Sequence, residues 1–232
     1  TAEDLLGDID PIKALKSGPL SIEAFTPGKI FKANNGILFF DELNRCPEKL
    51  QNALLQVLEE QKATLGSYDI DIPCEFIFIA TMNPEDSSTE KLSDVLLDRF
   101  DVLYMPYPES LKVEKEIVLL KGKKQDVSFS DDLLSFAVEF VRVLREDDQL
   151  DKKPSVRASL GLYERAQSSA VLGGRKKVVL KDIEDAVYSV LTHRISLKPS
   201  VKYLQKPEVY VKEALQKHME RSEVSSEDSD AG

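Results

Sequence analysis

The 232-residue sequence has few of the residues that build metal clusters and disulfide frameworks. It contains two cysteines, two histidines and no tryptophan. Cys46 and Cys74 form no CxxC motif, and His193 and His218 are the only histidines that accompany them. A zinc site or a disulfide network is therefore not expected, and both thiols are predicted to be reduced.

Long hydrophobic runs are missing as well. No apolar stretch approaches the length of a membrane-spanning helix and no signal peptide is present, so we expect a cytoplasmic protein without membrane association. The formal net charge of −10 argues against a general nucleic-acid binder, which normally carries a basic face. Part of this charge lies in the segment "ERSEVSSEDSDAG" (220–232), whose composition is typical of a disordered tail or a linker.

The segment "GILFFDELNR" (36–45) places two carboxylates directly after a short run of large apolar residues. Such a run predicts a strand buried on both faces of a parallel sheet, with Asp41 and Glu42 at its carboxyl end. Ligands of open α/β sheets bind beside this end of the strands. A hydrated Mg²⁺ that carries nucleotide phosphates suits Asp41, and Glu42 is then placed to activate water. The alternative is that both acids merely favour the start of the next helix, with Pro47 in its first turn.

Periodicity divides the rest of the chain into an α/β part and a helical part. The α/β part has a helix within residues 47–62, a hairpin over 63–72, a buried strand within 75–84, a short helix within 91–100 and an extended stretch over 102–108. Before residue 36, turn residues limit the prediction to a short helix and irregular or hairpin segments. After Pro108, helices are predicted over 130–144, 156–173, 180–195 and 207–221, the first capped by Ser130.

Four separated segments together resemble the AAA+ ATPases, most closely the branch of MoxR proteins and the ATPase subunit of magnesium chelatase. "ILFFDELNR" is similar to the Walker B box, "FIATMNP" to sensor 1, "LLDRF" to the arginine-finger segment and "PSVRASLGL" to the sensor 2 helix. The resemblance extends over residues 3–196 and implies a parallel P-loop NTPase sheet followed by an all-helical lid domain. The implied domains are residues 1–107 for the nucleotide-binding part, 108–196 for the lid and 197–232 for a C-terminal helix and acidic tail.

The resemblance also implies ATP and Mg²⁺ as cofactors and gives five side chains a role. Asp41 positions the metal, Glu42 activates the attacking water, and Asn83 orients that water or contacts the γ-phosphate. Arg99 is the finger offered to a neighbouring subunit, and Arg157 senses the phosphate from the lid. Catalysis is thereby assigned to Glu42, Asn83 and Arg99, and nucleotide binding to Asp41, Glu42, Asn83 and Arg157.

Each of these side chains has a simpler interpretation when it is taken alone. Asn83 is followed by a proline and suits a turn, Arg99 suits a solvated helix end, and Arg157 suits a surface charge. Asn44 and Arg45 are either subunit-interface groups or exposed residues of a first helical turn. The order in which the four segments occur, each at the end of the expected element, favours the family interpretation.

One part of the family pattern is absent, because no GxxxxGK[ST] phosphate loop occurs in the sequence. We therefore expect an N-terminally truncated chain with an incomplete sheet, in which residues 102–108 have no partner strand and which is inactive alone. The intact protein is expected to be an ATPase that acts as a ring, most simply a hexamer.

The resemblance implies a MoxR-like chaperone or chelatase-type motor that remodels, or inserts metal into, a protein client, for which a von Willebrand A domain protein is a candidate. Three alternatives stay open: the magnesium chelatase ATPase subunit itself, a DNA helicase of the minichromosome-maintenance kind, and a non-catalytic interaction module. The helicase is disfavoured because the hairpin segment "GSYDIDI" carries Asp69 and Asp71 and no basic residue.

Overall fold

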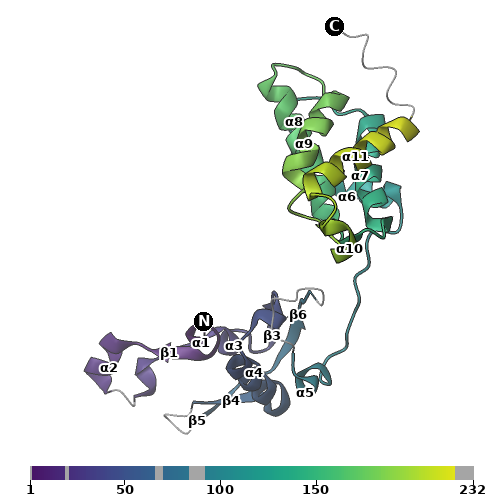
Figure 1. The fold of residues 1–232 in the computed structure, drawn as a ribbon. Helices are drawn as coiled ribbons and strands as arrows, with labels where there is room; N and C mark the ends of the chain where they lie inside the picture. Colours follow the sequence, from purple (N-terminus) through teal and green to yellow (C-terminus); the bar gives the residue numbers. More distant parts are fainter. Residues whose placement is uncertain (1, 19–20, 66–69, 84–91, 223–232) are drawn as a thin grey trace. The chain divides into compact units, whose positions relative to one another are not determined.

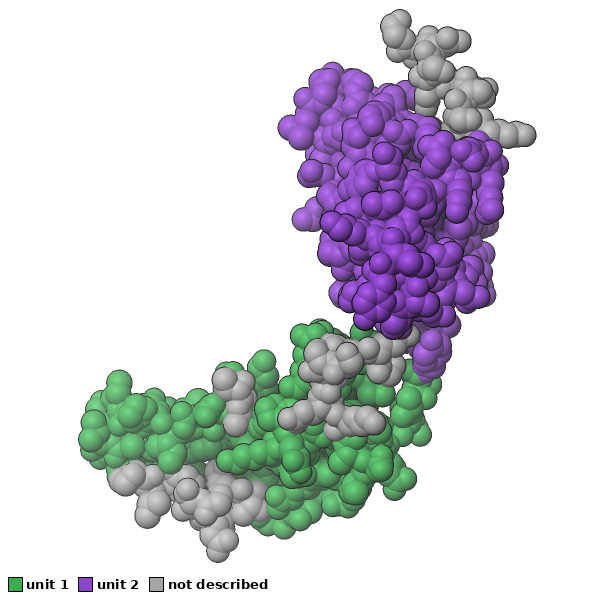
Figure 2. All heavy atoms as spheres, in the orientation of Figure 1, with its two compact units in different colours: residues 1–103 green, residues 104–232 purple. Residues whose placement is uncertain are grey.

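Two compact units make up the chain, and each has its own hydrophobic core. The computed structural model describes residues 2–18, 21–65, 70–83 and 92–222 (Figure 1). Unit 1 comprises residues 1–103 and unit 2 residues 104–232 (Figure 2). The division falls within the segment 102–108, close to the composition change at Pro108.

Unit 1 is an α/β arrangement of short elements around one long helix. In chain order they are α1 (Ala2–Leu6), β1 (Gly7–Ile9), α2 (Pro11–Ser17), the 3-10 turn η1 (Ile22–Ala24), β2 (Phe25–Pro27), α3 (Lys29–Lys32), β3 (Gly36–Phe40), the 3-10 turn η2 (Leu43–Arg45), α4 (Glu48–Glu60), β4 (Lys62–Leu65), β5 (Ile70–Pro73), β6 (Phe76–Ala80) and α5 (Asp94–Leu97).

The two strands predicted before Asp41 and Asn83 pair in parallel, as expected. The prediction that the second of them is buried is wrong, because Ile77 and Ile79 of β6 are 65% and 46% exposed. β3 and β6 are in register from Gly36 opposite Phe76 to Phe40 opposite Ala80. The predicted hairpin also forms, since β4 and β5 are antiparallel; its turn, residues 66–69 with Asp69, lies outside the described residues. Residues 102–108 belong to no strand.

The prediction that the strand before Asp41 is buried on both faces is wrong. Leu38 is 6% exposed, whereas Ile37 and Phe39 are 61% and 59% exposed. Successive side chains of a strand point to opposite faces, and the helices of unit 1 cover one of them. On the covered face Leu38 packs in a core with Leu54 and Val57 of α4.

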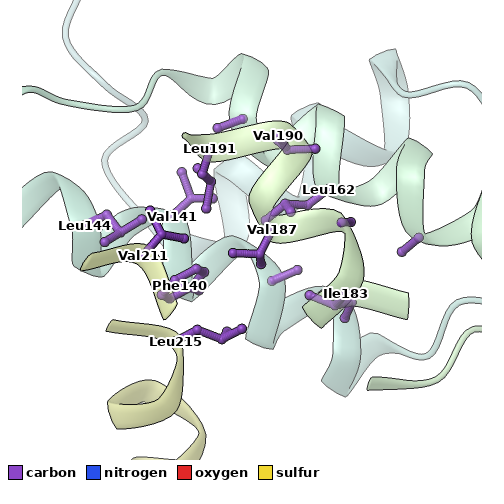
Figure 3. Close-up of a cluster of buried hydrophobic side chains, with 14 of the residues drawn as sticks. Phe140, Val141, Leu144, Leu162, Ile183, Val187, Val190, Leu191, Val211 and Leu215 are labelled. Carbon is purple, nitrogen blue, oxygen red and sulfur yellow. The ribbon is translucent and has the colours of Figure 1, made fainter. Parts of the chain in front are cut away.

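Unit 2 is helical, and its elements form a bundle. They are α6 (Leu111–Lys121), α7 (Asp131–Glu146), β7 (Leu150–Lys152), α8 (Val156–Leu172), α9 (Leu180–Leu191), β8 (Ser196–Leu197), α10 (Pro199–Lys202) and α11 (Pro207–Arg221). The predicted cap is confirmed, because the Ser130 hydroxyl accepts a hydrogen bond from the Leu133 N–H at the start of α7. Apolar side chains from α7, α8, α9 and α11 converge in one cluster (Figure 3).

Helix α11 packs into the same core as the predicted lid helices. Val211 and Leu215 are buried in the cluster formed by α7, α8 and α9. At its N-terminal end, the Tyr210 hydroxyl donates a 2.5 Å hydrogen bond to Asp147 just beyond α7. The pairing of β7 with β8 adds Leu150 and Leu197 to this core.

The two cysteines and the helices bear on the expectations about thiols and membrane-spanning segments. Cys46 and Cys74 are both free and buried, and burial raises the pKa of the Cys74 thiol. Within the described ranges, none of the helices combines the length and the apolarity needed to cross a bilayer.

A buried histidine makes the stability of unit 2 depend on pH. His218 of α11 lies against the rings of Phe136 and Phe140 of α7, and its Nε2 is 3.2 Å from the Phe136 carbonyl oxygen. Burial holds the pKa of His218 below its ordinary value, because it outweighs the opposing effects of this carbonyl and of Glu139. The charge of Arg221 adds a smaller lowering of the same pKa.

We predict that His218→Gln reduces the pH dependence of stability. The folded state binds the histidine proton less tightly than the unfolded state, so the free energy of unfolding falls as pH drops from about 7 toward the folded-state pKa. Urea unfolding followed by circular dichroism at pH 7.5 and 5.5 measures the difference. An equal loss of stability in the variant and the parent would show that His218 does not carry the effect.

Candidate functional site

The candidate site lies at the carboxyl ends of the two parallel strands β3 and β6. Asp41 and Glu42 follow β3, while Thr81 and Asn83 follow β6. Because Phe40 is paired with Ala80, the next residues of the two chain segments leave the sheet side by side. The structure thus brings together three of the five predicted site residues, namely Asp41, Glu42 and Asn83.

Thr81 connects the two strand ends, and sequence reasoning missed it. Its hydroxyl donates a 2.5 Å hydrogen bond to Asp41 Oδ1 and accepts a 3.0 Å hydrogen bond from the Glu42 N–H. Its carbonyl accepts from the Leu43 N–H at 2.9 Å, and its own N–H donates to the Phe40 carbonyl at 3.0 Å. The available signal was a small hydroxyl residue, Thr81, directly after one apolar strand, while an acid, Asp41, directly follows another apolar strand.

Glu42 has an unusual backbone conformation. Its φ of 56° and ψ of 54° place it in the left-handed region, where a side chain costs about 1–2 kcal/mol relative to the right-handed helix. Strain of this kind persists where neighbouring contacts enforce it, and it gathers at functional sites. Here the Thr81 hydroxyl and carbonyl hold the amides on both sides of the Glu42 Cα. The exposed carboxylate of Glu42 lies 3.3 Å from the Arg45 guanidinium.

Asn44 ties the turn after Glu42 to the segment after β6. Its side chain is buried, at 7% exposure, and its Nδ2 donates a 3.0 Å hydrogen bond to the Asn83 carbonyl. The interpretation of Asn44 as an exposed first-turn residue is therefore wrong. Arg45 is exposed, as that interpretation held.

The two predicted arginines belong to other elements of the chain. Arg99, just after α5, forms an ion pair with Glu59 of α4 and donates a 2.5 Å hydrogen bond to the Val95 carbonyl. Arg157 belongs to unit 2, where it is exposed in the first turn of α8. Arg99 thus belongs to unit 1 and Arg157 to unit 2.

The acids at the strand ends fit one class of cation. Hydrated Mg²⁺ takes one or two carboxylates and receives its remaining oxygens from water and phosphate. Asp41 and Glu42 are both exposed, and one oxygen of Asp41 already accepts from Thr81. Among the described residues no group of three histidine, cysteine, aspartate or glutamate side chains forms an all-protein metal site. The arrangement therefore suits a metal that arrives with its phosphate ligand.

Comparison with known families agrees with this geometry. Residues 2–102 match the ATPase family associated with various cellular activities (AAA), and residues 145–212 match the AAA lid domain. The first match contains β3, β6 and α5, and the second contains α8, α9, α10 and the start of α11 within unit 2. The chain belongs to the AAA+ ATPases.

Individual relatives narrow the family to a branch. The chain is 33% identical to the chaperone MoxR1 of Mycobacterium tuberculosis over 194 residues, which are 69% of this chain and 50% of MoxR1. It is 27% identical over 229 residues to a magnesium-chelatase subunit ChlI homolog of Methanocaldococcus jannaschii, covering 86% of this chain and 60% of that protein. The chain thus lies in the branch of MoxR proteins and magnesium-chelatase ATPase subunits, and it spans 50–60% of the length of these two relatives.

A solved structure supports the fold alone. A proline-to-glycine mutant of RuvB from Thermotoga maritima aligns with a TM-score of 0.53 at 16% identity, over 71% of this chain and 48% of that chain. The predicted architecture, a parallel AAA+ sheet followed by a helical lid, is confirmed in its order and in its pair of parallel strands.

We predict that Glu42→Gly stabilises the strand ends. Glycine adopts the left-handed conformation without the steric cost, so the local free energy of opening should rise by about 0.5–1 kcal/mol. Amide hydrogen exchange of peptides from β3 and β6 measures this change.

Two control variants separate strain from other effects of glycine. Gln61→Gly changes another residue with positive φ, at 53°, and should also stabilise locally. Glu48→Gly removes the acid that favours the N-terminus of α4 and replaces it with a poor helix former, so it should destabilise. Faster exchange in Glu42→Gly, as in Glu48→Gly, would contradict the assignment of strain.

Proposed function

We propose that the full-length protein is a Mg²⁺-dependent ATPase of the AAA+ ring type, which couples ATP hydrolysis to remodelling of, or metal insertion into, a protein client. One observation carries this proposal. The acid pair after β3 and the polar segment after β6 share one edge of a parallel sheet, joined through Thr81 and Asn44. A γ-phosphate with its metal and its attacking water requires charged and polar groups grouped in this way.

The strand-end residues divide the chemistry among them. Asp41 would hold the metal, and the hydrogen bond from the Thr81 hydroxyl fixes the orientation of its carboxylate. Glu42 projects from a strained backbone into solvent and acts as the base that accepts a proton from water. Asn83 orients that water with its side-chain amide. The metal, when bound with ATP, neutralises charge on the phosphate oxygens.

The remaining two roles involve a ring and the lid. Arg99 stabilises the transition state in the site of an adjacent subunit, for which it must exchange its ion pair with Glu59 for a phosphate. Arg157 reaches the γ-phosphate from the exposed first turn of α8. A site completed across subunits requires a closed ring, and a hexamer is the size that we propose.

Similarity supports the chaperone side of the branch over the chelatase side. Identity to MoxR1 is 33%, against 27–28% for the magnesium-chelatase subunits. We propose a protein client bound directly or through a von Willebrand A domain partner. The hairpin β4–β5 gives no support to DNA binding, since its Lys62 is paired at 2.5 Å with Asp71.

We predict that Glu42→Gln in the full-length protein abolishes ATP hydrolysis but leaves ATP binding intact. Glutamine keeps the size of the side chain and cannot accept the proton, so the rate should fall by about 10²–10⁴-fold. A phosphate-release assay measures turnover, and equilibrium dialysis with labelled ATP measures affinity. Glu48→Gln, an exposed acid on α4, should leave both unchanged. Hydrolysis within about twofold of the parent rate in Glu42→Gln would remove Glu42 from the mechanism.

We predict that mixing two inactive variants restores activity if Arg99 acts between subunits. A ring of Arg99→Ala and Glu42→Gln subunits contains interfaces where an intact Glu42 faces an intact Arg99. Mixing Arg99→Ala with the double variant Glu42→Gln/Arg99→Ala creates no such interface and should restore nothing. Phosphate release after subunit exchange gives the readout. Equal rates in both mixtures would contradict catalysis across the interface.

A further inference from the structure

A fully buried carboxylate lies at the junction of three helices of unit 2. Glu114 of α6 is 0% exposed. Its two oxygens each accept a 2.6 Å hydrogen bond from the guanidinium of Arg145 on α7, and Oε1 also accepts one of 2.6 Å from the Ser159 hydroxyl on α8. Arg142 of α7 approaches the same carboxylate at 3.4 Å. One side chain thus joins α6, α7 and α8.

Arg142 and Arg145 also contact residues 107–109, near the start of unit 2. Arg142 donates a 2.8 Å hydrogen bond to the Pro108 carbonyl and a 3.4 Å one to the Glu109 carbonyl. Arg145 lies over the Tyr107 ring, 4.7 Å from its centroid. Residues 107–109 are therefore held by the same guanidinium groups that hold Glu114.

The cluster also contacts Pro154 and Ser159, which precede and follow Arg157 in the sequence. Arg145 Nε donates a 2.7 Å hydrogen bond to the Pro154 carbonyl, before α8, and Ser159 is held by Glu114. Two helical positions are separated by about 200° around the axis, so an inward Ser159 directs Arg157 to the opposite side. The exposures agree, since Ser159 is 1% exposed and Arg157 is exposed.

Electrostatics favour the charged form of this carboxylate. Burial alone raises the pKa of Glu114, but hydrogen bonds from Arg145, Ser159 and Arg142 and the charge of Arg145 outweigh it, so the pKa is lowered. A buried ion pair is often no more stabilising than apolar residues of similar volume. The cluster is therefore a weak source of net stability, whereas its geometry fixes the direction of α8 relative to residues 107–109.

We propose that Glu114 is a positioning residue that sets the orientation of Arg157 and couples it to residues 107–109. This inference rests on the proposed function, in which Arg157 contacts the γ-phosphate. When Arg157 contacts the nucleotide, α8 is displaced, and the contacts of the Glu114 cluster pass this displacement to residues 107–109 near the start of unit 2. The carboxylate does not touch the nucleotide.

The test is a double-mutant cycle for ATP hydrolysis in the full-length protein. Ser159→Ala removes only the α8 contact of Glu114 and leaves its pairing with Arg145 intact, so the fold should persist. Ser168→Ala is the matched control, because that hydroxyl bonds within α8 to the Glu164 carbonyl. Ser159→Ala and Ser168→Ala are each introduced into the parent protein and into the Arg157→Ala variant. Circular dichroism checks that every variant is folded, and kcat and KM for ATP are then measured.

We expect Ser159→Ala to lower kcat/KM by about tenfold in the parent, since small misplacement of a positioned group is costly. In the Arg157→Ala background it should have no further effect, and Ser168→Ala should change neither background. If Glu114→Gln folds, it should lower kcat/KM in the same way as Ser159→Ala. If it does not fold, the Ser159 cycle alone decides the test.

Two other results would separate a failure of the proposed function from a failure of the positioning role of Glu114. If Arg157→Ala alone leaves kcat/KM unchanged, the sensing role in the proposed function fails and the inference fails with it. If Arg157→Ala lowers kcat/KM but Ser159→Ala has no effect, or the same effect in both backgrounds, the positioning role is overturned while the proposed function stands.

Discussion

The parallel pairing of β3 with β6 is the constraint on which the candidate site depends. The two strands are separated in sequence by a helix and a hairpin, yet their register places Phe40 opposite Ala80. Every later contact follows from that register, including the bridge from Thr81 to Asp41 and the bond from Asn44 to Asn83. A shift by one residue would separate Thr81 from Asp41 and would turn the side chains of one strand to the other face.

In unit 2, the role proposed for Arg157 requires that the start of α8 has a defined direction. Its apolar cluster packs α7, α8, α9 and α11 together. Apolar packing is tolerant of small rotations, whereas the bonds among Glu114, Arg145 and Ser159 are directional. The combination of a non-directional core and one directional ionic cluster suits the positioning role that we propose for Glu114.

Patterns of residues predicted much of this structure. Helices α4, α7, α8, α9 and α11 follow from apolar spacing, and the site edge follows from acids and an asparagine placed after apolar strands. The exposure of one face of β3, with Ile37 and Phe39, could not be predicted, because apolar residues mark a strand without showing what covers it. Thr81 and Glu114 were missed for a related reason. Their roles arise from partners about 30 to 45 residues away, and no local spacing reports such contacts.

We propose that a nucleotide-bound metal binds at the carboxyl ends of β3 and β6. Paramagnetic broadening of backbone amide signals tests it most directly, with Mn²⁺ and a non-hydrolysable ATP analogue bound to the full-length protein. A nucleotide-bound metal at these strand ends should strongly broaden the signals of residues 41–43 and 81–83, and Asp41→Asn should weaken that broadening. Broadening centred on another part of the chain, with the signals of Asp41 and Thr81 unaffected, would contradict it.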